Sequence, residues 1–129
     1  MKLNHDCVRF ILIYVEENLD YGHYLKILDM KHDDFSVEEL LYASDKLLEA
    51  GYLDGDKSKS ITSFIPDIRI TSLTWEGHQF LDNIRDDGVW KDTKKVISRF
   101  SSVSLGLIGN IASQIITSLI QNQLGSHQP

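Results

Sequence analysis

The chain has 129 residues, of which 42% are hydrophobic and 25% charged, and its formal net charge is −6. This length and composition predict a globular protein of about one domain with a buried core. Its single cysteine, Cys7, excludes an intrachain disulfide and a cysteine-based zinc site. No secretory signal is recognised, because the apolar run 8–15 contains Arg9 and leads into Glu16 and Glu17. A reduced, cytoplasmic protein is therefore expected.

The charges are unevenly distributed along the chain. Residues 1–60 contain seven basic and thirteen acidic residues, residues 61–99 contain six of each, and residues 100–129 contain none. Proteins that bind nucleic acid usually carry a basic excess where they dock, because phosphate contacts dominate their affinity. The acidic first half therefore disfavours nucleic acid and favours a basic protein partner.

A first helix is predicted from Asn4, a good N-cap, to the end signal at residues 20–22. Its apolar residues recur at helical spacing, so we expect a buried face and also a buried Cys7. The residues of this face are Val8, Ile11, Leu12, Val15 and Leu19. Residues 24–30 fit either a short helix or a strand edge through Leu25 and Ile27, and the pattern leaves both open.

A second helix is predicted to begin at the capping box of Ser36 and Glu39 and to end at Gly51. Its expected buried residues are Val37, Leu40, Leu41, Leu47 and Leu48. A strand follows from residue 52, then a polar hairpin tip over residues 55–60 and a returning strand over residues 61–73. In the returning strand Phe64, Ile68 and Ile70 should point inward, and Pro66 indicates an edge or a bulge.

Three further helices complete the chain. Thr74 is predicted to cap a helix that runs to Ile84, and amphipathic patterns continue over residues 89–100 and 103–124. The fold class is therefore α+β and mostly helical. We expect a winged-helix domain at residues 1–87, with a three-helix core and a β-hairpin wing, and a C-terminal helical extension at residues 88–129.

The same motifs carry a family resemblance over nearly the whole chain. The segments that carry it include SVEELLY at 36–42, LEAG at 48–51, and LTWEGHQFLDNIRDD at 73–87, together with residues 1–4, 11–19 and 89–90. On these segments the chain resembles domain-of-unknown-function family twenty-five-thirteen, small proteins of bacteria and their phages. The resemblance implies a cytoplasmic, often prophage-borne protein of winged-helix type, and it brings no catalytic residues.

No pattern in the sequence points to catalysis, a metal or a cofactor. His78 and Asp82 are four residues apart on a predicted helix, but no third and fourth ligand follow at zinc spacing. The cluster of Asp29, Asp33 and Asp34 lacks the glycine and the distal glutamate of a calcium loop. No serine resembles a nucleophile elbow. We therefore expect a protein that is not an enzyme.

In a winged helix, residues 36–50 would lie in the major groove of DNA. The outward positions of this helix are mostly acidic, and acidic side chains are repelled by phosphates. We therefore interpret Glu38, Glu39, Tyr42, Asp45 and Glu49 as a face for a protein partner. Candidate contacts for nucleic acid are instead basic residues of the hairpin and of the helix at 89–100: Lys57, Lys59, Lys91, Lys94, Lys95 and Arg99.

The uncharged C-terminal helix is apolar over more than one stripe. One stripe has the alternating spacing of three and four that is typical of a coiled-coil seam. Its residues are Leu105, Ile108, Ala112, Ile115 and Leu119. The helix could pack on its own domain, pair with a second copy or lie on a membrane surface. A transmembrane span is not expected, because polar residues interrupt the stretch.

These patterns favour one function and leave one alternative. The favoured function is a non-catalytic winged-helix module of phage or prophage type. It would bind a protein partner and form a dimer through its C-terminal helix. The alternative is a DNA-binding transcriptional regulator of a mobile element that uses a basic wing and the basic helix at 89–100.

Overall fold

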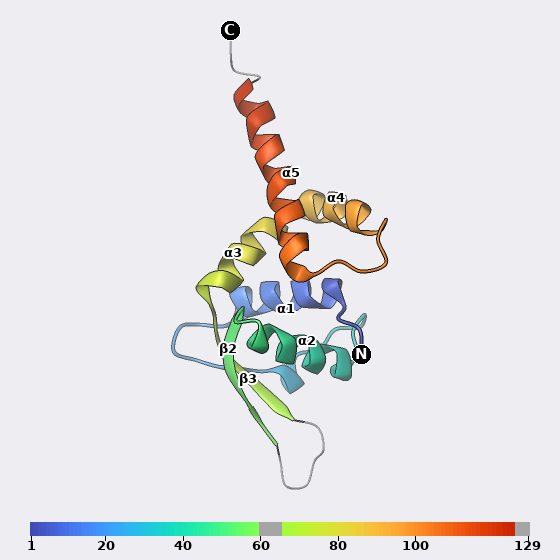
Figure 1. Cartoon of the computed structure of the whole chain (residues 1–129). Coiled ribbons are helices and arrows are strands. Elements are labelled where there is room, and N and C mark those ends of the chain that lie inside the picture. Colours follow the sequence, from blue (N-terminus) through green and yellow to red (C-terminus); the bar gives the residue numbers. More distant parts are fainter. Residues whose placement is uncertain (60–65, 126–129) are drawn as a thin grey trace. The chain divides into compact units, whose positions relative to one another are not determined.

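The computed structural model describes residues 1–59 and 66–125, and in these ranges the fold is mixed α+β and mostly helical (Figure 1). Two compact units divide the chain, Met1–Gln79 and Phe80–Pro129. The elements follow in the order α1 (His5–Asn18), β1 (Leu25–Lys26), the 3-10 helix η1 (Ile27–Asp29), α2 (Val37–Glu49), β2 (Leu53–Ser58), β3 (Asp67–Leu73), α3 (Trp75–Ile84), α4 (Asp87–Ile97) and α5 (Leu105–Gly125).

The core of the first unit lies between α1, α2 and a three-stranded antiparallel sheet. The predicted inward residues Ile68 and Ile70 of β3 are fully buried. On the two helices the predicted faces are also buried at Cys7, Val8, Ile11, Leu12, Val15, Leu40, Leu41 and Leu47. The helical and alternating patterns therefore predicted most of these core residues, because each pattern indicates which side of an element is buried.

Residues 24–30, for which the sequence left a helix and a strand open, contain a short piece of each. Leu25 and Lys26 form β1, which pairs antiparallel with Ile70 and Arg69, and η1 follows immediately. The strand order is β1-β3-β2, so β3 is the central strand. Pro66 precedes this strand rather than interrupting it, which keeps the N–H groups of the ladder intact.

Strand β2 extends further along the chain than we predicted. The polar segment 55–58 belongs to β2, where Gly55 pairs with Ile70 and Lys57 with Ile68. The register shifts between Asp54 and Gly55, which marks a bulge that lets the polar run continue the ladder. Phe64 and the rest of residues 60–65 lie outside the described residues.

Val37 is a second difference from the sequence expectation. We placed it in the core, yet its side chain is 48% exposed, whereas Leu40 and Leu41 on the same helix are buried. Val37 is the first residue of α2, directly after the Ser36 cap. Its side chain lines a hollow together with Pro66 and Ile68, so an apolar residue remains accessible there.

The C-terminal unit contains the end of α3 together with α4 and α5. The boundary between the two compact units falls between Gln79 and Phe80, inside α3. Phe80 explains this position, because its ring lies directly against Gly109 of α5, 3.1 Å from where a Cβ would stand. Asp86 caps α4 by accepting a hydrogen bond from the Val89 N–H at 3.0 Å.

Candidate interaction surfaces

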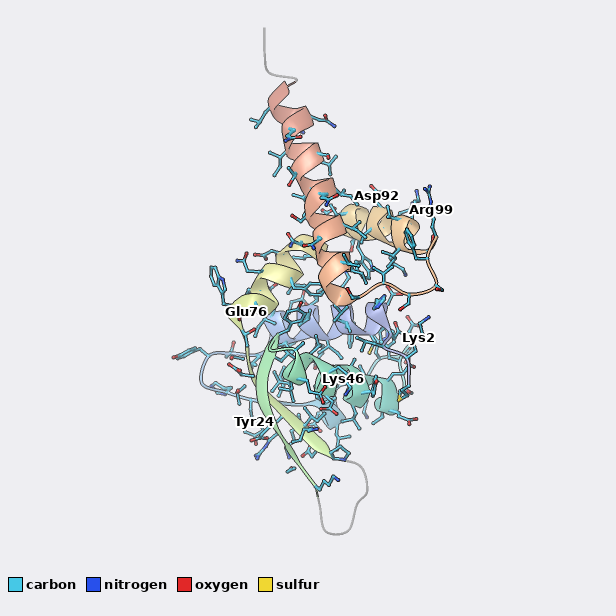
Figure 2. The ribbon with its side chains drawn as sticks, viewed as in Figure 1. Lys2, Tyr24, Lys46, Glu76, Asp92 and Arg99 are labelled. Carbon is cyan, nitrogen blue, oxygen red and sulfur yellow. The ribbon has the colours of Figure 1, made fainter. Side chains whose placement is uncertain are left out.

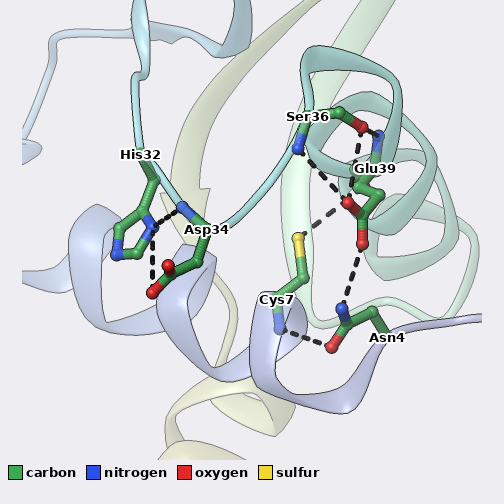
Figure 3. A network of polar contacts seen from close by, with 6 residues as sticks. All are labelled: Asn4, Cys7, His32, Asp34, Ser36 and Glu39. Carbon is green, nitrogen blue, oxygen red and sulfur yellow. Dashed lines mark hydrogen bonds and ion pairs between the residues drawn. The ribbon is translucent and has the colours of Figure 1, made fainter.

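A polar network at the start of α2 fixes the geometry of the surfaces around it (Figure 3). The Glu39 N–H donates to Ser36 Oγ at 3.1 Å, and the Ser36 N–H donates to Glu39 Oε1 at 3.3 Å. Asn4 Nδ2 donates to Glu39 Oε2 at 3.0 Å, while Asn4 Oδ1 accepts from the backbone of α1. The predicted caps of α1 and α2 are therefore joined to each other by one side-chain hydrogen bond.

This network gives Glu39 a structural role. The Asn4 amide and the Ser36 N–H stabilise the carboxylate and lower its pKa below the usual value. Burial raises the pKa of Cys7 to about 12, and the negative charge of Glu39 makes a smaller contribution in the same direction. The Cys7 thiol donates to the Glu39 carbonyl oxygen at 3.7 Å. Glu39 is thus engaged within the fold rather than available as part of a partner face.

Two other residues of the predicted partner face are in ion pairs. Asp45 Oδ1 lies 2.9 Å from Lys57 Nζ of β2, and Glu49 Oε2 lies 3.0 Å from Lys46 Nζ on the same helix. The Lys46 ammonium also lies 5.4 Å from the centre of the Tyr42 ring. Of the five residues, Glu38 and Tyr42 make no side-chain hydrogen bond or ion pair with a described residue, and Tyr42 has only the ring contact with Lys46.

A groove runs beside α2 and has a volume of about 630 Å³. We call it the α2 groove. Its apolar lining comes from Met1, Val37, Leu41, Pro66 and Ile68, and its polar lining from Ser36, Glu38, Tyr42 and Asp45. Three of these residues, Glu38, Tyr42 and Asp45, were predicted to belong to a partner face because of their outward helical positions. The apolar lining of the groove was not predicted, because Val37 was assigned to the core and because Met1 and Ile68 lie far from α2 in sequence.

An aromatic cluster lies on the α1 side of the same unit. The Phe10 ring centre is 4.4 Å from that of His32 and 5.7 Å from that of Phe35. His32 Nδ1 accepts from the Asp34 N–H at 3.0 Å, which orders the loop before α2. These contacts give Asp34 a place in the structure of this loop.

The candidate contacts for nucleic acid fall on both units. Lys57 is engaged with Asp45, so part of its charge is offset by the acidic helix beside it. In the C-terminal unit the side chains of Lys91, Lys94, Lys95 and Arg99 are all exposed. Arg99 lies just beyond the end of α4 at Ile97, where Figure 2 labels it.

The predicted seam of α5 has two different halves. Ile108 and Ala112 are fully buried, and Gly109 between them is buried against Phe80. Leu119 is 52% exposed, and the next apolar residues, Ile120 and Leu124, are 53% and 65% exposed. Five residues that the sequence grouped as one seam therefore divide into a buried first part and an exposed end, with Leu105 and Ile115 half-buried.

The exposed end of α5 borders a second hollow of about 430 Å³. It is lined by Asp86 and Val89 of the α4 segment and by Ile116, Leu119, Ile120, Gln123 and Leu124 of α5. We call these five α5 residues with Val89 the α5 patch. In Figure 1 this part of α5 continues beyond α4, and Leu119, Ile120 and Leu124 on it are each more than half exposed.

His78 and Asp82 do not face a common ligand. His78 Nδ1 lies 3.8 Å from Glu16 Oε2 of α1, while Asp82 Oδ1 accepts from Arg85 Nη1 at 2.7 Å. Among residues 1–59 and 66–125, no group of three or more His, Cys, Asp and Glu side chains could hold a metal ion. Within the same ranges, none of the helices combines the length and the apolar character that crossing a membrane requires.

Comparison with known proteins defines the class of this α+β protein. Residues 2–104 match the family described as "Hypothetical protein (DUF2513)". The chain belongs to this family, which confirms the resemblance read from its motifs. A protein of Haemophilus influenzae (strain ATCC 51907 / DSM 11121 / KW20 / Rd), named "Uncharacterized protein", is 32% identical over 121 residues, covering 93% of this chain and 99% of that protein. No solved structure matches the chain significantly.

Proposed function

We propose that the protein is a non-catalytic winged-helix interaction module that forms a dimer through the α5 patch and binds a protein partner through its N-terminal unit. The element order from α1 to β3, with a short turn in place of a full middle helix, supports the winged-helix assignment. A mobile-element origin is part of the same proposal and rests on the family resemblance.

The observation that carries the proposal is the exposed apolar surface at the end of α5. Leu119, Ile120 and Leu124 are each more than half exposed on a helix without charged residues. Soluble monomers rarely leave a continuous apolar surface of several hundred Å² in water. Burying each large side chain contributes roughly 1.5–3 kcal/mol. A symmetric pair of patches would therefore gain enough to offset the entropy of association.

The structure also changes which residues should be tested. Ile108 is fully buried within one chain, so a glutamate there would disrupt the fold whether or not the protein dimerises. The informative variant is Leu119→Glu with Leu124→Glu, since both side chains are exposed. Its control is Ser118→Glu with Gln121→Glu, which adds the same charge to exposed polar positions of the same helix.

The measurement is the molar mass in solution by sedimentation equilibrium over a range of concentrations. The parent protein and the control should be dimeric, and the Leu119/Leu124 variant should be a folded monomer with an unchanged circular dichroism spectrum. A parent protein that is monomeric at all concentrations would contradict the α5 dimer, and so would a Leu119/Leu124 variant that remains dimeric.

One observation favours a second function, DNA binding by a regulator of a mobile element. Lys91, Lys94, Lys95 and Arg99 are all exposed within about two turns of chain. Such a stripe could contact a phosphate backbone. Against it, the acidic α2 face would be repelled by phosphates, and Lys57 is already paired with Asp45. The salt dependence of binding, described below, separates the two functions.

A further inference from the structure

We propose that the α2 groove docks an amphipathic helix of a partner protein, with one apolar face and flanking lysine or arginine side chains. The inference rests on the proposed role as an interaction module and specifies the partner's chemistry. It goes beyond the acidic face predicted from sequence, because it assigns the binding surface to an apolar floor with an acidic rim.

The floor of the groove provides apolar contact area. Val37 and Leu41 lie one turn apart on α2, and Pro66 and Ile68 of β3 line the groove beside them. Leu41 and Ile68 expose little of their own surface, so Val37 carries most of the accessible area of α2 in the floor. Val37 is half exposed although it begins a helix whose other large aliphatic side chains are mostly buried. Residues spaced by four positions on a helix match the apolar stripe of a second helix packed against them.

The rim of the groove determines the charge of the occupant. Glu38 is exposed and makes no hydrogen bond or ion pair with a described residue. Asp45 contacts Lys57 through Oδ1, so its other carboxylate oxygen is not used in that ion pair. Residues 1–79 as a whole contain eight basic and fifteen acidic residues. Carboxylates at the edge of an apolar groove attract lysine and arginine and repel phosphates or acidic segments. A cationic segment is therefore the complementary occupant.

The sheet explains why the occupant should be a helix rather than an added strand. Ile68 belongs to the central strand β3, where it pairs with Lys57 of β2, and η1 contacts β3 as well. The backbone at the groove is thus already bordered by other elements, and a peptide could not extend the ladder there. Recognition must use side chains, which is the helix-in-groove mode.

The test uses the full-length, isotope-labelled protein and a synthetic amphipathic peptide of about 15 residues, with leucine at the i, i+3, i+4 and i+7 positions and lysine elsewhere. A peptide with glutamate in place of lysine is the charge control. NMR titration at about 0.15 M salt should shift the amide signals of Val37, Glu38, Leu41, Tyr42 and Ile68 with the lysine peptide, and the glutamate peptide should cause no shifts.

Two substitutions test the floor and the rim separately. Glu38→Lys should weaken the affinity for the lysine peptide by about ten-fold, as expected when a rim attraction becomes repulsion. Glu17→Lys makes the same charge change on α1 outside the groove lining and should weaken it by less than about two-fold. Val37→Ser should weaken it by about five-fold, and Val96→Ser, an exposed valine of α4, should have no effect.

Several outcomes would overturn the proposal. These are amide shifts outside the groove, equal binding of both peptides, and equal effects of Glu38→Lys and Glu17→Lys. If Glu38→Lys instead lowers the molar mass of the protein alone, the occupant is a second copy rather than a partner helix. The NMR titration tests binding at the α2 groove, whereas sedimentation equilibrium tests dimer formation through the α5 patch. A monomeric parent protein that still binds the lysine peptide would therefore contradict only the α5 dimer.

Discussion

The side chain of Asn4, at the start of α1, is hydrogen-bonded to Glu39, in the first turn of α2 and 35 residues later in the chain. Its oxygen accepts from the N–H groups of Asp6 and Cys7, and its amide donates to Glu39 Oε2 at 3.0 Å. Glu39 in turn completes the capping box of α2 with Ser36. Two local signals, each readable in sequence, are therefore joined by a tertiary contact that fixes where α1 begins relative to α2.

Replacing Asn4 should separate its two roles. Asn4→Ala removes both the cap and the donor, and should lower the free energy of unfolding by about 0.5–2 kcal/mol. Asn4→Asp keeps a good cap but places a second carboxylate beside Glu39, and repulsion between the two should lower the free energy of unfolding at neutral pH. This decrease should become smaller at acidic pH, where the carboxylates are protonated. Urea unfolding at pH 7 and pH 4 measures both effects. Equal losses for the two variants at both pH values would contradict this account.

The pH dependence of stability should report the lowered pKa of Glu39. A carboxyl group whose pKa is lower in the folded state stabilises the fold above its unfolded pKa, and this contribution is lost as the pH falls through the folded pKa. Glu39→Gln should therefore be less stable than the parent at pH 7, and the difference should shrink as the pH falls below about 4.5. A difference that stays constant between pH 7 and pH 3 would exclude Glu39 as its source.

Cys7 should be chemically inert in the folded protein. Its burial and the nearby Glu39 charge raise the pKa of the thiol to about 12, so almost no thiolate exists near pH 8. A disulfide reagent such as dithionitrobenzoate should react slowly with the native protein and rapidly after urea is added. Fast reaction in the absence of urea would show that the environment of Cys7 is open to solvent.

Two glycines should respond in opposite directions to alanine. A Cβ at Gly77 would clash with the Tyr52 carbonyl oxygen and the Leu73 side chain, whereas a Cβ at Gly106 would meet nothing within 4 Å. Gly77→Ala should destabilise the fold by about 1–3 kcal/mol through overpacking. Gly106→Ala should stabilise α5 by up to about 1 kcal/mol through helix propensity. Thermal unfolding of both variants gives the sign of each effect, and destabilisation by Gly106→Ala would contradict the open surroundings of that position.

The salt dependence of DNA binding tests the second function. If the basic stripe contacts phosphates, the logarithm of the affinity for duplex DNA should fall steeply with the logarithm of the salt concentration. Replacing Lys91, Lys94, Lys95 and Arg99 with glutamine should flatten that slope by about three to four units. Replacing Lys2, Lys26 and Lys31 with glutamine removes three positive charges elsewhere in the chain and is the control. Absence of binding at low salt would exclude this function.

The sequence by itself determined the elements of this protein and most of their faces. Asn4 and Ser36 cap the helices that we assigned to them, and Thr74 accepts from the Gly77 N–H at 3.0 Å as the predicted cap of α3. Gly51 ends α2 with a φ of 79°, a conformation that favours glycine. These features were predictable because each depends on a few neighbouring residues.

Only the tertiary structure decided which apolar and charged side chains remain accessible. Ala112 and Leu119 occupy equivalent positions in one heptad pattern, yet the first is buried and the second is half exposed. Val37 follows the pattern of the α2 core but lines a groove, and Lys57 of β2 is paired with Asp45 of α2. Helical periodicity gives the direction of a side chain around its own axis. Burial and charge pairing depend on how far neighbouring elements extend along that axis, and that is set by contacts between residues distant in sequence.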